Sequence, residues 1–304
     1  MIEKLELLLY LARERHFGKA AQAAGVAQPT LSSALKSLED QLGVLIVERG
    51  SRFRGFTPEG ERILDWARKL TADARAMRQE AADMRRPGMG ELRLGVIPTA
   101  LAVLPRITLP FADRHPQAVL HIQSMTSARI LESLENLEID LGVSYLGEEP
   151  LGRYKGLPLY AERYALLTGP GGPFAERETL TWAEAGTASL CQLTPDMQNR
   201  RLIDRRLREA GVEPGCTLVA NSLLALIAHV GTGRWATIAP VRLAEALDWP
   251  GRLRAIPLTD PEVTHEIGLI LPARDTHAPL VARFLEEAER RAIGGADRLT
   301  EPSH

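Results

Sequence analysis

The 304-residue sequence predicts an α/β protein, and three observations lead to this class. Two short helical segments separated by Gly25 lie near the start of the chain. A long segment over residues 59–87, with no Gly or Pro between Gly60 and Pro87, follows them. From residue 92 onward, short apolar runs alternate with helical patterns. Such alternation is typical of layered α/β domains, whereas the first two segments predict helices alone.

The first helical pair predicts a helix-turn-helix. Gly25 can adopt the left-handed conformation that ends one helix, and Pro29 falls in the first turn of the next, where its missing N–H is not needed. One apolar stripe at 4-3-4 spacing follows: Leu31, Leu35, Leu38 and Leu42. Short polar side chains off this stripe can reach base edges in a major groove. The candidates are Gln28, Pro29, Thr30, Ser32, Ser33 and Lys36. An ordinary helical hairpin with a polar outer face is the alternative.

The next segment predicts a wing beside these helices. An apolar run over residues 42–47 is followed by charge and then by a glycine-flanked basic loop over residues 50–60. Arg49, Arg52 and Arg54 would lie on this wing, where guanidinium groups can contact phosphates or enter a minor groove. The sequence therefore predicts a winged helix-turn-helix over residues 1–58.

These residues resemble the N-terminal domain of the LysR-type transcriptional regulators. The resemblance lies in Ala20-Ala21, Gln28-Pro29, Ser32, Leu38-Glu39, Leu42-Gly43, Glu48-Arg49, Thr57 and Gly60. One departure is Ala27, because the family usually has a Ser there that caps the recognition helix. Loss of a Ser cap costs about 1 kcal/mol, so we expect the start of this helix to be held less firmly.

The long helix over residues 59–87 carries an apolar seam at steps of four and three residues, the spacing of a coiled coil. Its members are Ile63, Ala67, Leu70, Ala74, Met77, Ala81 and Met84. The seam could pack against the chain's own domain, but its polar flanks and abrupt end at Arg86-Pro87-Gly88 favour a partner helix. In the LysR-type family this segment is the linker helix, so the resemblance implies a dimer and a dimer of dimers.

The segment over residues 90–293 predicts a second, α/β domain. Strands are expected near residues 92–97, 119–123, 140–145, 162–168, 188–192, 217–220, 235–239 and 266–271. The resemblance continues through Leu104-Pro105, Phe111, His115-Pro116, residues 137–141, residues 230–233 and Ala239-Pro240. It implies a periplasmic-binding-protein-like fold with crossing strands near residues 160 and 266. Lobe I would comprise residues 90–160 and 266–293, lobe II residues 161–265, and a ligand cleft would lie between them. Residues 294–304 form a tail without a recognisable pattern.

Hydroxyl side chains gather at the expected junctions between strands and helices. Free N–H groups and the positive end of the helix dipole make such junctions suitable for an anion, although Ser and Thr at these positions also serve as helix caps. The candidate effector residues are Thr99, Ala100, Thr126, Ser127 and Thr194. Thr99 and Thr126 also match the motif positions of effector contacts in the family. We therefore expect a small anionic metabolite, with carboxylates as the favoured class.

Composition excludes several other classes of protein. Residues 1–90 hold 15 Lys and Arg against 12 Asp and Glu, a net of +3, and the remainder 22 against 27, a net of −5. The basic excess thus lies on the half expected to bind DNA. Cys191 and Cys216 have no partner motif, and the seven His lack ligand spacing, so neither a metal nor a disulfide is expected. No signal peptide or membrane span is evident, and no catalytic residue or cofactor is predicted.

The leading interpretation is a cytoplasmic, one-component transcription regulator that binds promoter DNA and itself. RNA polymerase is the further partner that the resemblance implies. A cytoplasmic solute-binding protein with an N-terminal adaptor is the first alternative, and the missing signal peptide and the ordered N-terminal motif count against it. A two-lobed enzyme is the second, but it would need an acid–base pair that the sequence does not display.

Overall fold

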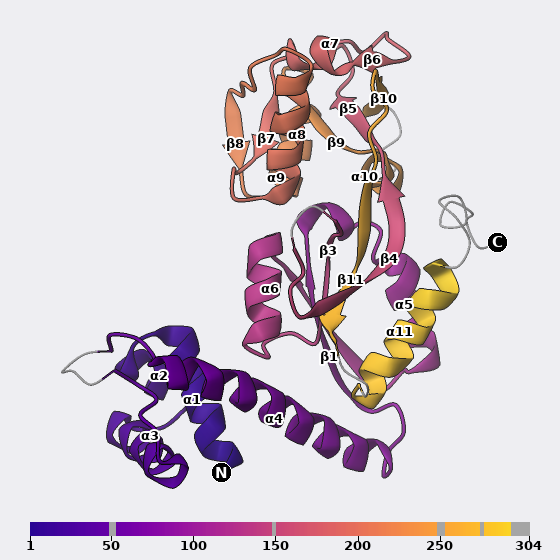
Figure 1. The fold of residues 1–304 in the computed structure, drawn as a ribbon. Helices are drawn as coiled ribbons and strands as arrows, with labels where there is room; N and C mark the ends of the chain where they lie inside the picture. The colour runs from indigo at the N-terminus through magenta and orange to yellow at the C-terminus, as the bar shows by residue number, and fades with distance from the viewer. Residues whose placement is uncertain (49–52, 148–149, 248–252, 274–276, 293–304) are drawn as a thin grey trace. The chain divides into compact units, whose positions relative to one another are not determined.

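The computed structural model describes residues 1–48, 53–147, 150–247, 253–273 and 277–292. The chain divides into two compact units, one formed mainly by residues 1–90 and the other mainly by the residues that follow. Helices make up the first unit, and mixed sheets with helices make up the second (Figure 1), which confirms the predicted α/β class. Within the described residues, every helix is too short or too polar to cross a membrane.

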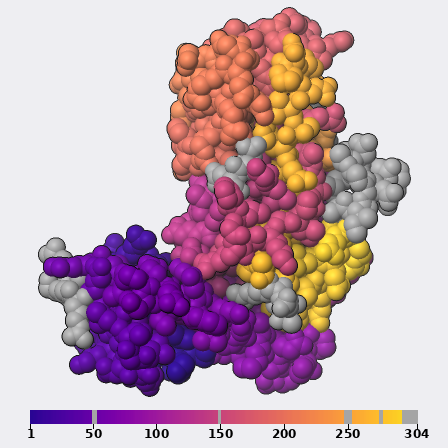
Figure 2. Space-filling view, viewed as in Figure 1, coloured from indigo at the N-terminus to yellow at the C-terminus, as the bar shows by residue number. Residues whose placement is uncertain are grey.

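The first unit contains the predicted helix-turn-helix. Its helices are α1 (Ile2–Glu14), α2 (Phe17–Ala23), α3 (Gln28–Leu42) and α4 (Pro58–Asp83), whose residues are coloured from indigo to purple in the space-filling view (Figure 2). Gly25 lies in the turn between α2 and α3 with φ +68°, and Pro29 is in the first turn of α3. Three members of the predicted leucine stripe are buried: Leu31, Leu35 and Leu38. Leu42 is exposed, because it is the last residue of α3.

The helices of this unit begin in different ways. Ala27 provides no side-chain cap for α3, as the sequence predicts. At α2, by contrast, the His16 ring accepts hydrogen bonds from the backbone N–H groups of Gly18 and Lys19. At α4, Thr57 Oγ1 accepts from the Gly60 N–H at 2.9 Å. Because α3 lacks such a bond, its position depends on the burial of its leucines.

The described parts of the predicted wing end at Glu48 and resume at Phe53, because residues 49–52 lie outside the described residues. Val47 and Phe56 form an antiparallel bridge, and the Glu48 N–H donates to the carbonyl of Gly55 at 3.1 Å. The Glu39 carboxylate, on α3, accepts from the Ile46 N–H at 2.8 Å and from the Val47 N–H at 3.1 Å. One side chain of α3 therefore holds the first strand of the wing.

Gly60 is expected to be indispensable for the stability of this unit. A Cβ atom at Gly60 would lie 2.1 Å from the carbonyl oxygen of Ile46, so Gly60→Ala must displace either the wing or α4. Overpacking of this kind costs about 1–3 kcal/mol and occasionally more. Urea unfolding followed by circular dichroism should show this loss, whereas Glu59→Ala, at an exposed neighbouring position, should leave the midpoint unchanged. Equal midpoints for the two variants would contradict the expected clash.

The second unit is built from many short strands and helices. The strands are β1 (Gly90–Val96), β2 (Ala118–Ser124), β3 (Leu141–Tyr145), β4 (Tyr154–Glu162), β5 (Tyr164–Thr168), β6 (Leu180–Thr181), β7 (Cys191–Leu193), β8 (Leu218–Ala220), β9 (Ala236–Pro240), β10 (Arg254–Thr259) and β11 (His265–Pro272). The helices are η1 (Pro98–Ala100), α5 (Pro105–Arg114), α6 (Ser127–Glu135), α7 (Trp182–Gly186), α8 (Gln198–Glu209), α9 (Leu223–Val230), α10 (Val241–Leu247) and α11 (Pro279–Ala292).

These strands form two main sheets and a small one. The five-stranded sheet has the order β2-β1-β3-β11-β4, the four-stranded sheet β6-β10-β5-β9, and β7 pairs with β8. Parallel β1 and β3 lie beside β11, which is antiparallel to both β3 and β4. The chain leaves the five-stranded sheet at the end of β4 and returns at the start of β11 (Figure 1). These crossings at residues 162–164 and 259–265 agree with the expected positions near 160 and 266.

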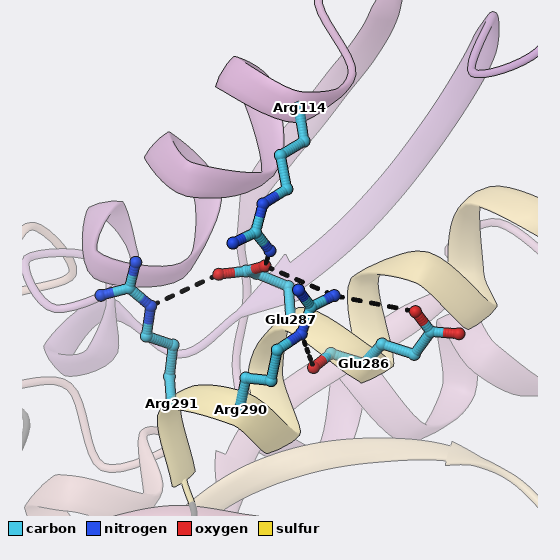
Figure 3. A network of polar contacts seen from close by, with 5 residues as sticks. All are labelled: Arg114, Glu286, Glu287, Arg290 and Arg291. Atoms are coloured by element: carbon cyan, nitrogen blue, oxygen red, sulfur yellow. Dashed lines mark hydrogen bonds and ion pairs between the residues drawn. The ribbon is translucent and has the colours of Figure 1, made fainter.

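An ion-pair network fastens the last helix to α5 (Figure 3). Its centre is Glu287 on α11, which is buried and accepts a hydrogen bond from Arg114 of α5. Arg291 Nε lies 3.3 Å from Glu287 Oε1, and Arg290 Nη2 lies 3.8 Å from Oε2 and 3.7 Å from the Glu286 carboxylate. A buried carboxylate needs such partners because desolvation of its charge is costly.

Candidate nucleic-acid interface and ligand pocket

The polar face of α3 is available to a partner. All six predicted contact residues are exposed: Gln28, Pro29, Thr30, Ser32, Ser33 and Lys36. The buried leucines occupy the opposite face of the helix, where they pack with α1 and α2. Short side chains on an exposed helix allow its backbone to approach the floor of a major groove. The helix therefore has the chemistry and the accessibility that base recognition requires.

Aromatic packing joins the wing to α2, the helix that precedes α3. The Phe53 ring lies 6.3 Å from that of Phe17 on α2 and 5.1 Å from that of Phe56, with edge-to-face angles of 72° and 66°. Arg54, between the two wing phenylalanines, is exposed, whereas Arg49 and Arg52 lie outside the described residues. Sequence reasoning identified the arginines but missed the phenylalanine anchors, for which the spacing of Phe53 and Phe56 was the available signal.

The predicted seam of α4 has a buried first part and an exposed second part. Ala67 is fully buried in the core of its own unit, so its side chain is not open to a partner helix in this structure, whereas Ile63 is half-buried and packs against that core. The reason is that the first turns of α4 pack on α1. Farther along, Leu70, Met77 and Met84 are 39, 67 and 76% exposed. Ala81 is exposed and Ala74 half-buried between them. Trp66, 59% exposed, extends this stripe and was not predicted.

A pocket in the second unit lies where η1, β3, α6 and α8 meet. In this structure its cavity volume is about 10 Å³, and it is lined by Ile97, Pro98, Thr99, Thr126, Ser127, Tyr145, Leu193, Met197, Gln198 and Asn199. Three of the five predicted effector residues thus line it. Ala100 and Thr194 do not line it: Ala100 is buried in the core, and Leu193, the last residue of β7, lines the pocket where Thr194 was expected. Tyr145, Gln198 and Asn199 were missed by the sequence reasoning.

The polar groups of this pocket are neutral donors and acceptors. Ser144 Oγ donates to Ser127 Oγ at 2.9 Å, and Thr126 Oγ1 accepts from the Arg129 N–H at 3.2 Å, capping α6. Thr99 is 1% exposed, and its hydroxyl makes no well-formed hydrogen bond within the described part of the chain, although it lies close enough to the Tyr145 hydroxyl to lower the pKa of that phenol. None of the described lining residues carries a charged side chain. The first residues of α6 and α8 also line the pocket.

A buried acid lies directly behind the pocket. Asn199 Nδ2 donates to Tyr145 Oη at 3.1 Å, and Tyr145 Oη lies 3.2 Å from Glu162 Oε2. Tyr160 Oη lies 3.2 Å from Glu162 Oε1. Glu162 has an exposure of 0%, and this burial raises the pKa of its carboxyl to about 8. Burial, together with the charge of Glu162, also raises the pKa of the Tyr145 phenol.

Cys191 is not placed for thiolate chemistry. Cys191 is buried on β7, and burial raises the pKa of its thiol to about 11. Cys216 is half-buried. Nucleophilic or redox-active cysteines require a lowered pKa and access to solvent, and Cys191 has neither. Among the described residues, no group of three or more His, Cys, Asp and Glu side chains is arranged to hold a metal ion.

Two family models match almost the whole chain. Residues 2–61 match the bacterial regulatory helix-turn-helix protein of the lysR family, and residues 85–292 match the LysR substrate binding domain. The two matches fall on the exposed α3 helix and on the domain that contains the pocket.

Similar proteins and structures span the same length. The DNA-binding transcriptional dual regulator OxyR of Escherichia coli K12 is 29% identical over 97% of this chain and 96% of its own. A probable hydrogen peroxide-inducible genes activator of Streptomyces viridosporus is 32% identical over 95% of this chain and 94% of its own.

Among solved structures, a full-length OxyR variant from Pseudomonas aeruginosa is 24% identical, with a TM-score of 0.72, and covers 100% of this chain and 98% of that one. Full-length CbnR in complex with its target DNA is 23% identical, with a TM-score of 0.59, over 96% of this chain and 100% of that one. Both structures share the fold described above. The chain therefore belongs to the LysR family, and it is a DNA-binding, self-associating transcription regulator that responds to an effector.

Proposed function

We propose that this regulator binds a partly palindromic promoter site as a dimer, or as a dimer of dimers, in the cytoplasm, where it acts with RNA polymerase. The α3 face from Gln28 to Lys36 contacts base edges, and Arg54 contacts phosphate together with Arg49 and Arg52 of the wing. The exposed α4 stripe from Trp66 to Met84 joins two subunits. Exposed large apolar side chains in a regular row support this role, because monomeric proteins rarely leave such rows uncovered.

The effector of this proposal is a small carboxylate bound in the pocket. One observation carries this part: the Thr99 hydroxyl is buried and lines the pocket, and its interaction with the Tyr145 hydroxyl falls short of a well-formed hydrogen bond. A buried polar group without a partner is costly, and a ligand oxygen would satisfy it. The N-termini of α6 and α8, which supply unpaired N–H groups and the positive end of a dipole, favour a negative charge in the same place.

We do not extend peroxide sensing from the relatives to this chain. Two of the relatives are described as activators of hydrogen peroxide-inducible genes, but reaction of a thiol with peroxide requires an accessible thiolate. Burial and the raised pKa of Cys191 oppose this reaction. Cys191 is therefore a poor peroxide sensor, and a bound metabolite is the signal that we propose.

Thr99→Val is expected to weaken effector binding about tenfold, because it keeps the shape of the side chain and removes one hydrogen bond of about 1–1.5 kcal/mol. Calorimetry of the full chain against a panel of acetate, lactate, malonate, succinate and benzoate is the measurement. DNA binding without effector should be unchanged, since Thr99 belongs to the second unit.

Thr108→Val is the matched control, because Thr108 is half-buried on α5 and does not line the pocket. If the Thr99 variant and the wild type bind the carboxylate with equal affinity, the Thr99 hydroxyl does not contact the effector. If no carboxylate binds but a neutral analogue such as acetamide or benzamide does, the proposal that the effector is an anion is wrong.

A further inference from the structure

The Glu162 cluster has two hydrogen-bond arrangements. With an ionised carboxylate, both phenols donate to Glu162, so the hydroxyl hydrogen of Tyr145 is directed away from the pocket. With a neutral carboxyl, Glu162 has a hydrogen of its own to donate to Tyr145 Oη. The Tyr145 hydroxyl can then donate toward Thr99 or toward a molecule in the pocket. One proton on Glu162 therefore decides whether Tyr145 offers the pocket a donor.

Burial favours the neutral arrangement. Both phenol oxygens lie 3.2 Å from Glu162, so neither stabilises an ionised carboxylate as a short, charge-assisted hydrogen bond would. The pKa of about 8, which results from burial, has the same consequence at neutral pH. Of the described groups around Glu162, the two phenols and the nearby Arg242 favour ionisation, and they do not offset burial.

The surroundings of Glu162 come from several elements of the second unit. The Arg242 guanidinium of α10 lies 5.4 Å from the ring of Tyr160. His265 of β11 stands opposite Glu162 in the strand register, and its ring lies 6.1 Å from that of Tyr145 and 5.4 Å from that of Tyr164. The titratable and charged groups facing the carboxyl are therefore Tyr145, Tyr160, Tyr164, His265 and Arg242. An experiment that titrates this region must therefore distinguish the proton on Glu162 from the proton on His265.

We infer that Glu162 is a positioning residue of the effector pocket, which holds a proton while an anion is bound and so links effector binding to proton uptake from solvent. This inference rests on the proposed function of the pocket. An anion that accepts from Tyr145 would lie within about 6 Å of the Glu162 carboxyl, and a like charge at that distance disfavours ionisation. Binding should therefore weaken, by up to about tenfold per pH unit, above the pKa of Glu162.

The first experiment follows the proton on Glu162 without any ligand. Infrared spectroscopy of the full chain between about pH 6 and pH 10 should show the C=O stretch of a protonated carboxylic acid that disappears near the pKa of about 8. Ordinary Asp and Glu are ionised in this range, and a His residue contributes no such band. The Glu162→Gln variant should lack the band. A wild-type spectrum without it would overturn the inference.

The second experiment places a fixed anion in the pocket. Thr126→Asp introduces a carboxylate at a lining position, and Thr126→Asn is its neutral control of nearly equal shape. We expect the midpoint of the Glu162 infrared titration to lie about one pH unit higher in the Asp variant than in the Asn variant. The double variant Thr126→Asp, Glu162→Gln should show no band, which assigns the signal to Glu162. Equal midpoints would overturn the linkage.

These results are separable from the proposed function. A Glu162 titration that shifts with the introduced charge, together with failure of all carboxylates to bind, would retain the proton site and remove the proposed effector class. Binding of a carboxylate to the wild type with the same affinity at about pH 6.5 and pH 9 would retain the pocket and overturn the proton linkage.

Discussion

Met77→Asp is expected to weaken subunit association at least about a hundredfold. In a pairing of two α4 helices, Met77 would enter the contact, and each subunit would place an unpaired carboxylate there. A buried charge without a partner costs about 3–5 kcal/mol. Sedimentation equilibrium at micromolar concentration should therefore find monomers of the variant and dimers, or larger assemblies, of the wild type. Because Met77 is 67% exposed in the single chain, the fold of each unit should survive.

Ala82→Asp is the control for this experiment. Ala82 is also exposed on α4, but it lies five residues from Met77 and so about 140° around the helix. It adds the same charge to the same helix outside the proposed stripe. If both variants dissociate equally, net charge and not the stripe governs association. If neither dissociates, the subunits are joined elsewhere.

The second large effect is expected at the base-reading face of α3. Replacement of Gln28 and Ser32 together by Ala should abolish the specific footprint on the DNA upstream of the protein's own gene. Each good base contact is worth about 1–3 kcal/mol of discrimination, so the loss of two contacts should bring binding close to the non-specific level. Gln41→Ala, at an exposed position near the end of α3, is the matched control.

Arg54→Ala gives a different result if the wing contacts phosphate. Specific and non-specific DNA should then lose affinity alike, and the dependence of log K on log salt should become shallower by about one charge. Footprints that remain intact in the Gln28 and Ser32 double variant would show that α3 is not the reading helix.

The local signals in the sequence predicted the first unit well because its structure depends on local rules. Gly25 and Pro29 delimit α3 by their backbone preferences, and the leucine stripe identifies its buried face. The α4 seam was only partly correct for a reason that is not local. Its spacing could not reveal that the first turns of the helix serve the unit's own core, which removes Ala67 from the proposed partner face and leaves Trp66 on it.

The second unit shows where single-sequence reasoning fails. Most of β4 was missed because Gly156 and Pro158 weaken the strand pattern; the structure pairs Pro158 with Gly268 at a register shift and Gly156 with Ile270. The short strand β6 and the strand β10 were also missed, since β6 has only two residues and β10 contains Pro257.

The pocket was only half predictable for a related reason. Thr99, Thr126 and Ser127 follow strands and could be found from junction chemistry. Tyr145 ends a strand in which every residue is buried, so its pattern indicates core. Asn199 belongs to a helix whose many arginines indicate solvent. Only the fold brings these two side chains together, 54 positions apart in the chain.

The bond from Glu39 to the wing has a consequence for the DNA sites that this protein can accept. Because one carboxylate of α3 holds two N–H groups of the wing strand, the helix and the wing should move as a single rigid body. The distance between their two contacts within one half-site is then set by the protein, and an inserted base pair there should not be tolerated. Between half-sites, spacing depends instead on the pairing of α4 helices. Operators should therefore vary in their central spacer and keep a constant length on either side of it.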